Sequence, residues 1–132
     1  MVKSFAKRMR DRGIQVEIGT NLWKQNIAAA VSQAIILGTP VDTGQARGNW
    51  LASLGSPIST ASTRTDKSGG GTIARNMGII RAATLNAPIY ITNNVGHIQR
   101  LNDGWSAQAP AGFVESAILA GEITAKRMKV FK

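Results

Sequence analysis

The feature that most constrains the fold is a stripe of apolar residues at helical spacing that ends just before a proline. Its members are Trp23, Ile27, Val31, Ala34 and Ile35. Thr20 or Asn21 can cap the start of such a helix. Gly38 stands where a glycine ends many helices, and Pro40 prevents continuation. The stripe predicts a helix over about residues 21–37 with one buried face, which the rest of the chain has to cover.

Shorter patterns predict a small sheet and further helices. Alternating apolar residues are typical of strands, and apolar residues three to four apart are typical of helices. These patterns predict strands at residues 48–57 and 88–94. They predict a helix at residues 72–86, a short helix from about residue 95 that ends at a turn at Asp103-Gly104, and a last helix over about 110–129 with Pro110 in its first turn. The chain is therefore predicted to be one α+β domain over residues 1–132. A small antiparallel or mixed sheet packs against the long helix and the C-terminal helix.

The two ends of the chain are basic, within a formal net charge of +9. Residues 1–13 form a basic N-terminal segment with one acid, Asp11, and the last seven residues carry four basic side chains and no acid. Helical spacing predicts a short helix at residues 3–12, which Gly13 interrupts. The alternation in "IQVEI" at residues 14–18 then predicts an extended segment. Basic ends of this kind favour acidic surfaces or nucleic acid as partners.

A polar segment separates the first predicted strand from the next helix. Residues 56–71 are mostly Ser, Thr and Gly, which predicts a flexible loop or arm. Gly69-Gly70-Gly71 lacks the lysine that a phosphate-binding loop places after its glycines, so no nucleotide site is expected there. Long loops in compact domains are often functional, and this one can reach a neighbouring subunit.

Composition excludes several kinds of chemistry. The chain has Cys 0, which rules out disulfides, thiolate metal sites and cysteine nucleophiles. His97 is the single histidine, so a histidine metal site or a Ser-His-Asp triad has no evident partner set. No apolar run approaches a membrane span, and no apolar signal core follows the basic start. We expect a soluble protein without metal or cofactor that is not secreted through a cleaved signal.

The triplet Asp42-Thr43-Gly44 is the one motif that suggests catalysis, because aspartic proteases carry it at their active site. Such proteases need the triplet at the end of a buried strand and pair two copies so that the carboxylates share a proton. Here a long helix precedes it, and Pro40 stands where a central strand would need a donor. A structural turn fits better, with Asp42 as an acceptor of backbone N–H groups and Gly44 as the flexible position. The other carboxylates show no paired spacing, so we expect no catalytic residues and no enzymatic activity.

Four segments in fixed order resemble a known family. They are "TPVDTGQARGNW" (39–50), "IYITNN" (89–94), "RLNDGWS" (100–106) and "QAPAGFVESAI" (108–118). The set resembles the tail-completion, or neck, proteins of long-tailed bacteriophages, which join the filled head to the tail. The match spans about residues 30–125. One departure is Gly96-His97, where the family pattern has a proline and an aromatic residue.

The resemblance implies a structural virion protein at the neck, made in the cytoplasm of a bacterial host. It implies a ring of the chain with itself, a hexamer around the DNA channel. Head-side connector proteins would lie on one side, and a tail tube or tail terminator protein on the other. No membrane is involved, and the basic ends can meet acidic partners or the passing DNA. We expect the assembly interface in the loop and around the Asn-Asn turn, at Ser59, Arg64, Lys67, Asn93, Asn94 and His97.

Two other functions stay open from the residues alone. One is a small basic nucleic-acid-binding protein, which rests on the net charge and predicts duplex binding that weakens steeply with salt. The other is a homodimeric aspartic protease, which rests on Asp42-Thr43-Gly44 alone and predicts that Asp42→Asn abolishes cleavage.

Overall fold

The structure is a computed structural model that describes residues 5–104 and 111–128, with side chains described from residue 20 onward. In these residues the chain forms five helices and two strands. They are α1 (Phe5–Gly38), α2 (Gln45–Gly48), β1 (Leu51–Leu54), α3 (Gly70–Arg81), β2 (Ile89–Thr92), α4 (Ile98–Asn102) and α5 (Phe113–Arg127). The predicted α+β class is confirmed. No described helix has the length and apolarity to cross a membrane.

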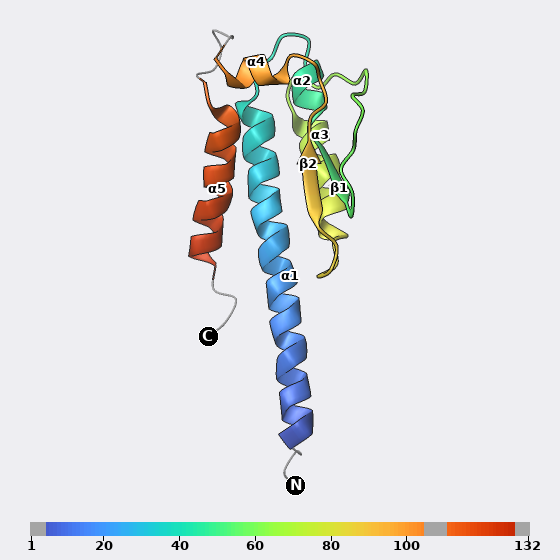
Figure 1. Cartoon of the computed structure of the whole chain (residues 1–132), viewed down its shortest axis with the longest axis vertical. Helices are drawn as coiled ribbons and strands as arrows, with labels where there is room; N and C mark the ends of the chain where they lie inside the picture. The colour runs from blue at the N-terminus through green and yellow to red at the C-terminus, as the bar shows by residue number, and fades with distance from the viewer. Residues whose placement is uncertain (1–4, 105–110, 129–132) are drawn as a thin grey trace.

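The long helix α1 is the centre of the fold. Figure 1 shows α5 against one side of its C-terminal half and α3 with the two strands on the other side. The core contains Ile35, Ile36, Trp50, Phe113 and Ala117, with Ile36 fully buried. α5 comes very close to α1 at Gly121, where an added Cβ would lie 2.5 Å from Val31 Cγ2. Helices therefore cover the apolar stripe of α1 more than the sheet does.

The sheet has two antiparallel strands in a single register. Leu51 pairs with Thr92 and Leu54 with Ile89. The ladder continues one step past the strands, because Gly55 N donates to Pro88 O at 2.9 Å. A sheet this small is not stable alone and depends on the helices beneath it.

A buried amide fastens the sheet to α1 and α3. Asn76 Nδ2 donates to Trp50 O at 2.8 Å and to Ser32 Oγ at 3.2 Å, and its Oδ1 accepts from Ala52 N at 3.1 Å. Arg75 donates to the same oxygen at 3.1 Å. Asn76 is fully buried, and these bonds offset the cost of burying its amide.

The predicted extended segment at residues 14–18 is wrong, because these residues lie inside α1. Gly13 does not break the helix, since a glycine inside a helix costs only about 1 kcal/mol. The predicted helix over 21–37 is therefore the C-terminal half of one that begins at Phe5. Ile14, Val16 and Ile18 alternate in sequence, but strand spacing over five residues is too short to outweigh the helix on both sides.

Other boundaries moved by a few residues. α3 begins at Gly70, so the polar loop ends at residue 69, and α3 ends at Arg81 rather than at residue 86. α5 begins at Phe113, after Gly112 with φ 87°, and ends at Arg127. The expected role of Pro110 lies outside the described residues, as do Lys129 and Lys132.

Candidate functional site

The segment from Thr39 to Trp50 joins the end of α1 to the sheet through buried polar contacts. Thr39 Oγ1 donates to Ile35 O at 2.6 Å and accepts from Trp50 Nε1 at 2.7 Å. Both Thr39 and Trp50 are buried. Trp50 belongs to the hydrophobic core. Its indole N–H holds the helix end and the start of the sheet together.

Arg47 fastens three pieces of backbone at the C-terminal end of α1. Its guanidinium donates to Leu37 O at 3.1 Å, to Thr39 O at 2.8 Å and to Lys67 O at 2.9 Å. The first two are carbonyls at the helix end, where a cation is favoured by the helix dipole. Arg47 therefore closes α1 and holds the polar loop against it.

Gly44 is the point at which the Asp-Thr-Gly turn touches that loop. Its φ is 89°, and an added Cβ would lie 2.7 Å from Lys67 N. Gly44 O accepts from Asp66 N and from Gly48 N, each at 2.9 Å. Glycine is favoured here for two reasons, because the backbone is left-handed and because another backbone lies where a side chain would begin.

The side-chain acceptor of this turn is Thr43, whereas Asp42 was predicted for that role. Gln45 N donates to Thr43 Oγ1 at 3.2 Å. Asp42 is exposed, and α1 and a bend precede it rather than a strand. The triplet therefore lies in a turn that is unlike the strand-end position of a protease triplet.

Asn49 holds the second half of the polar loop. Its Oδ1 accepts from Ser62 N at 2.7 Å, and its Nδ2 donates to Ser62 O at 3.2 Å and to Arg64 O at 3.4 Å. A further bond from Nδ2 reaches Gln45 O at 2.7 Å. Asn49 is fully buried, so the loop covers it. The loop predicted as flexible is thus fastened to the body of the domain from Ser62 onward.

Asp66 ends the loop and begins α3. Its carboxylate accepts from Thr72 Oγ1 at 2.7 Å, from Thr72 N at 2.8 Å and from Gly69 N at 3.1 Å. These bonds, the Thr72 hydroxyl first, hold the pKa of the Asp66 carboxyl below its ordinary value of 3.8. A carboxylate at this position satisfies free N–H groups of the first turn and favours the positive end of the helix.

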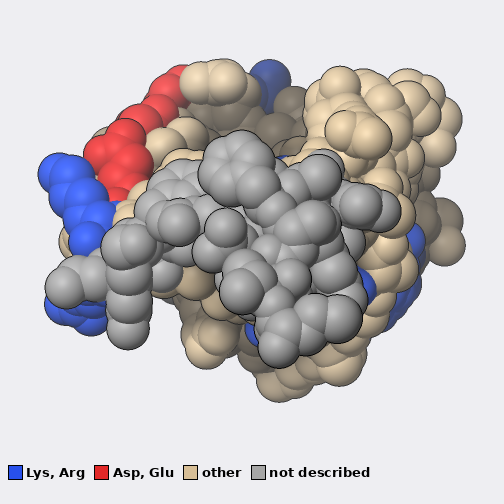
Figure 2. All heavy atoms as spheres, turned by 90° about the horizontal axis from the view of Figure 1, so that it is seen from below, with Lys and Arg blue, Asp and Glu red and all other residues tan. Residues whose placement is uncertain are grey.

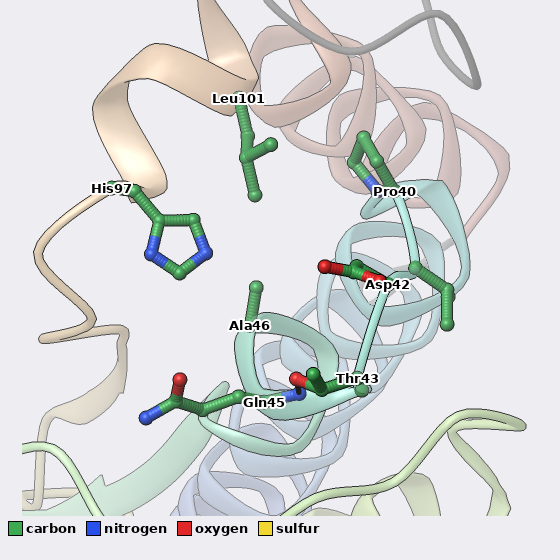
Figure 3. A pocket seen from close by; sticks show the side chains of 9 residues that line it. Pro40, Asp42, Thr43, Gln45, Ala46, His97 and Leu101 are labelled. Carbon is green, nitrogen blue, oxygen red and sulfur yellow. Dashed lines mark hydrogen bonds between the residues drawn. The ribbon is translucent and has the colours of Figure 1, made fainter.

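A cavity of about 280 Å³ lies between the Asp-Thr-Gly turn, α2 and α4. Its lining residues are Pro40, Val41, Asp42, Thr43, Gly44, Gln45, Ala46, His97 and Leu101. In Figure 3 the His97 ring and the Asp42 carboxylate lie on opposite sides of the hollow, with Leu101 and Ala46 between them. Its lining holds one carboxylate, that of Asp42, and one imidazole, that of His97. Among the described residues, no cluster of His, Asp and Glu could hold a metal ion.

Part of the predicted assembly interface lies near this cavity, at Asn93, Asn94 and His97. Asn93 Nδ2 donates to Ala46 O and Asn94 Nδ2 to Ile58 O, each at 2.8 Å. Both amides are therefore used within the chain. The side chains of Ser59, Arg64, Lys67 and His97 are exposed and available to a partner.

Sequence reasoning missed the residues that hold the site together, namely Arg47, Asn49, Asp66 and Asn76. The partners of Arg47, Asn49 and Asn76 are mostly backbone groups that are distant in sequence, so no local spacing predicts them. Asp66 instead bonds to Gly69 and Thr72, which lie close by in sequence at the start of α3. An asparagine directly before a buried tryptophan, as in "RGNW", is the nearest indication that the sequence offers.

Figure 2, the view from below, shows the visible Lys and Arg side chains at separate places around the outline, with acidic side chains next to basic ones at one margin.

In comparisons with known proteins, no protein-family model, curated protein or solved structure matches the chain.

Proposed function

We propose that the chain is a structural virion protein that completes the tail of a long-tailed bacteriophage and joins it to the head. It would act as a ring, with six copies around the DNA channel and no catalytic role. Connector proteins would bind on the head side and a tail tube or terminator protein on the tail side. The protein would be made in the host cytoplasm and end in the neck of the virion.

One observation carries the proposal, which is that the four resembling segments meet at one end of the fold. Asn93 of the second segment donates to Ala46 of the first. Leu101 of the third lines the same cavity as Pro40 and Ala46. Asn102 Oδ1 accepts from Val114 N at 2.9 Å, which joins the third segment to the fourth. Segments that recur in order and contact each other form a structural unit, which supports the resemblance beyond its separate short motifs.

The test is electron microscopy of the purified full chain. We expect rings with six-fold symmetry, and a chain that forms no ring at any concentration at which it stays soluble would refute the ring. A deletion of residues 60–70 is a poor variant, because it removes Asp66 and the loop backbone that Asn49 holds.

A sharper variant reverses charge on exposed loop side chains. Arg64→Glu with Lys67→Glu should abolish rings and leave thermal unfolding unchanged, since only the backbone of these residues bonds within the body. Lys126→Glu with Arg127→Glu is the matched control, since it makes the same change of charge on two exposed residues of α5 far from the loop, and it should form rings. Rings from the double variant would show that the loop is not the interface.

The nucleic-acid alternative is favoured by one feature, the basic stretch Lys7 to Arg12 at the start of α1, where Figure 1 shows the helix beyond the rest of the domain. It predicts duplex binding in a gel shift at low salt that is lost at higher salt.

The protease alternative predicts that the parent chain cleaves peptides and that Asp42→Asn abolishes the cleavage. A parent chain without peptide cleavage would refute this alternative. Cleavage that survives Asp42→Asn would show that Asp42 is not the catalytic residue.

A further inference from the structure

The outer face of α5 carries exposed apolar side chains beside two acids. Ile118, Leu119 and Ile123 are 51%, 53% and 42% exposed, and the exposed carboxylates of Glu115 and Glu122 lie three to four residues from them on the same face. The opposite face of α5 packs on α1. Scattered exposed apolar residues are normal, but three within six residues of one helix indicate a contact surface.

The opposite flank of the subunit is basic. Figure 1 shows α5 on one side of α1, and the two strands with α3 and the polar loop on the other. Residues 51–92, which run from β1 to the end of β2, contain Asp66 as their single acid, and their basic residues are Arg64, Lys67, Arg75 and Arg81. The Asp66 carboxylate is bonded at the start of α3, whereas Arg64 and Lys67 are exposed. This flank therefore presents positive charge to a partner.

The basic flank also offers an aromatic side chain. Tyr90 pairs with Ser53, and Ile91 pairs with Ala52. Ile91 packs against the core, and Ala52 is buried. Because successive side chains of a strand point to opposite faces, Tyr90 lies on the outer face of the sheet, where it is half-buried. Tyrosine is enriched at protein interfaces, so the flank combines apolar contact area with positive charge.

The two flanks are complementary, but α1 separates them within one subunit (Figure 1). They can therefore meet only between copies. A contact between two different patches, repeated from copy to copy, closes into a ring when the rotation allows it. We propose that in the neck ring the outer face of α5 of each subunit packs on the sheet and polar loop of the next subunit. This inference rests on the proposed function, and it names the two surfaces that meet between neighbouring subunits.

Glu122 is the acid best placed to pair with the neighbouring subunit. Glu115 accepts from Asn102 Nδ2 at 3.1 Å within the chain, whereas Glu122 has no such partner among the described residues. A carboxylate beside Ile118, Leu119 and Ile123 loses water when the contact forms, so an opposite charge has to meet it. The exposed side chains of Arg64 and Lys67 on the next subunit supply that charge.

The test scores rings of the full chain by electron microscopy and their mass by sedimentation. The parent should form six-fold rings built from chains of 14.0 kDa. Leu119→Asp should raise the concentration needed for rings roughly tenfold or more, because it buries a charge without a partner. Its circular dichroism should match the parent, since Leu119 is exposed. Leu22→Asp is the matched control, because Leu22 is 48% exposed on α1 and belongs to neither surface, and it should keep the rings.

Mixing two variants tests whether the contact joins two different surfaces. Glu122→Lys should form no rings alone, like Arg64→Glu with Lys67→Glu. In a mixture of the two, each α5 meets a loop of opposite charge, so rings of alternating chains should form, and an even number of subunits allows the alternation to close. Lys126→Glu with Arg127→Glu adds acid to α5 and should keep its rings.

Rings from Leu119→Asp or Glu122→Lys at the concentration of the parent would overturn this contact and leave the proposed function standing. A mixture of the two charge variants that forms no rings would do the same. A parent chain that forms no ring would instead refute the ring itself, and this contact with it.

Discussion

Replacing Gly44 with alanine is the sharpest test of the structural role of the Asp-Thr-Gly turn. A left-handed backbone costs a residue with a side chain about 1–2 kcal/mol. The added Cβ would also lie 2.7 Å from Lys67 N and 2.9 Å from Asp66 N, so the loop backbone has to move. That movement endangers the bond from Asp66 N to Gly44 O, which is worth about 0.5–1.5 kcal/mol. We expect Gly44→Ala to lose about 2–4 kcal/mol of unfolding free energy.

Gly55→Ala is the matched control for this prediction. Gly55 has φ 84°, but an added Cβ there would meet nothing within 4 Å. It should therefore lose only the backbone term of about 1–2 kcal/mol. Both variants are measured by urea unfolding, followed by the fluorescence of the tryptophans, among them the buried Trp50. Equal losses in the two variants would refute the argument that Gly44 is required by the close approach of the loop.

Three further predictions concern α3 and its start. Gly78→Ala should raise the unfolding free energy by about 0.5–1 kcal/mol, because Gly78 is exposed inside a helix and its Cβ would meet nothing within 4 Å; a loss in urea unfolding would contradict this. Asp66→Ala should cost about 1–2 kcal/mol at neutral pH through the lost helix cap. The pKa of Asp66 is lowered in the folded chain, so its contribution is complete above 3.8 and disappears as the pH falls through the folded pKa. The gap between parent and variant in urea unfolding should close on acidification, and a gap that is independent of pH would contradict this. Asn76→Ala should lower the unfolding free energy by about 3 kcal/mol or more, because it leaves Trp50 O and Ala52 N without their partner. The loss is measured by thermal or urea unfolding. A loss below about 1 kcal/mol would show that water replaces the amide.

The sequence indicated the elements of this fold better than the contacts between them. The apolar stripe from Trp23 to Ile35 predicted the packed half of α1, because a buried helix face requires apolar residues every three to four positions in the sequence. The N-terminal half of α1 was wrongly predicted as a short helix followed, after Gly13, by an extended segment. Helix spacing and strand spacing are hard to distinguish over five residues.

The site was harder to predict for a different reason. Arg47 and Asn49 donate to backbone carbonyls, and because every residue carries a carbonyl, the sequence does not show which one is the partner. Gly44 was recognised as the flexible position of a turn, but the loop that lies against it is more than twenty residues further along the chain. Only the tertiary structure brings them together.

The side chain of Asn76 also explains why the sheet stops at two strands. In the register of β1 and β2, the groups of Leu51 and Ser53 point toward β2, so Trp50 O and Ala52 N point to the open edge of β1. The Asn76 amide bonds to both, as the peptide group of a third strand would. An unpaired edge is a template on which other chains add strands and aggregate. One buried amide therefore closes this edge, and its loss would expose the chain to edge-to-edge aggregation as well as to unfolding.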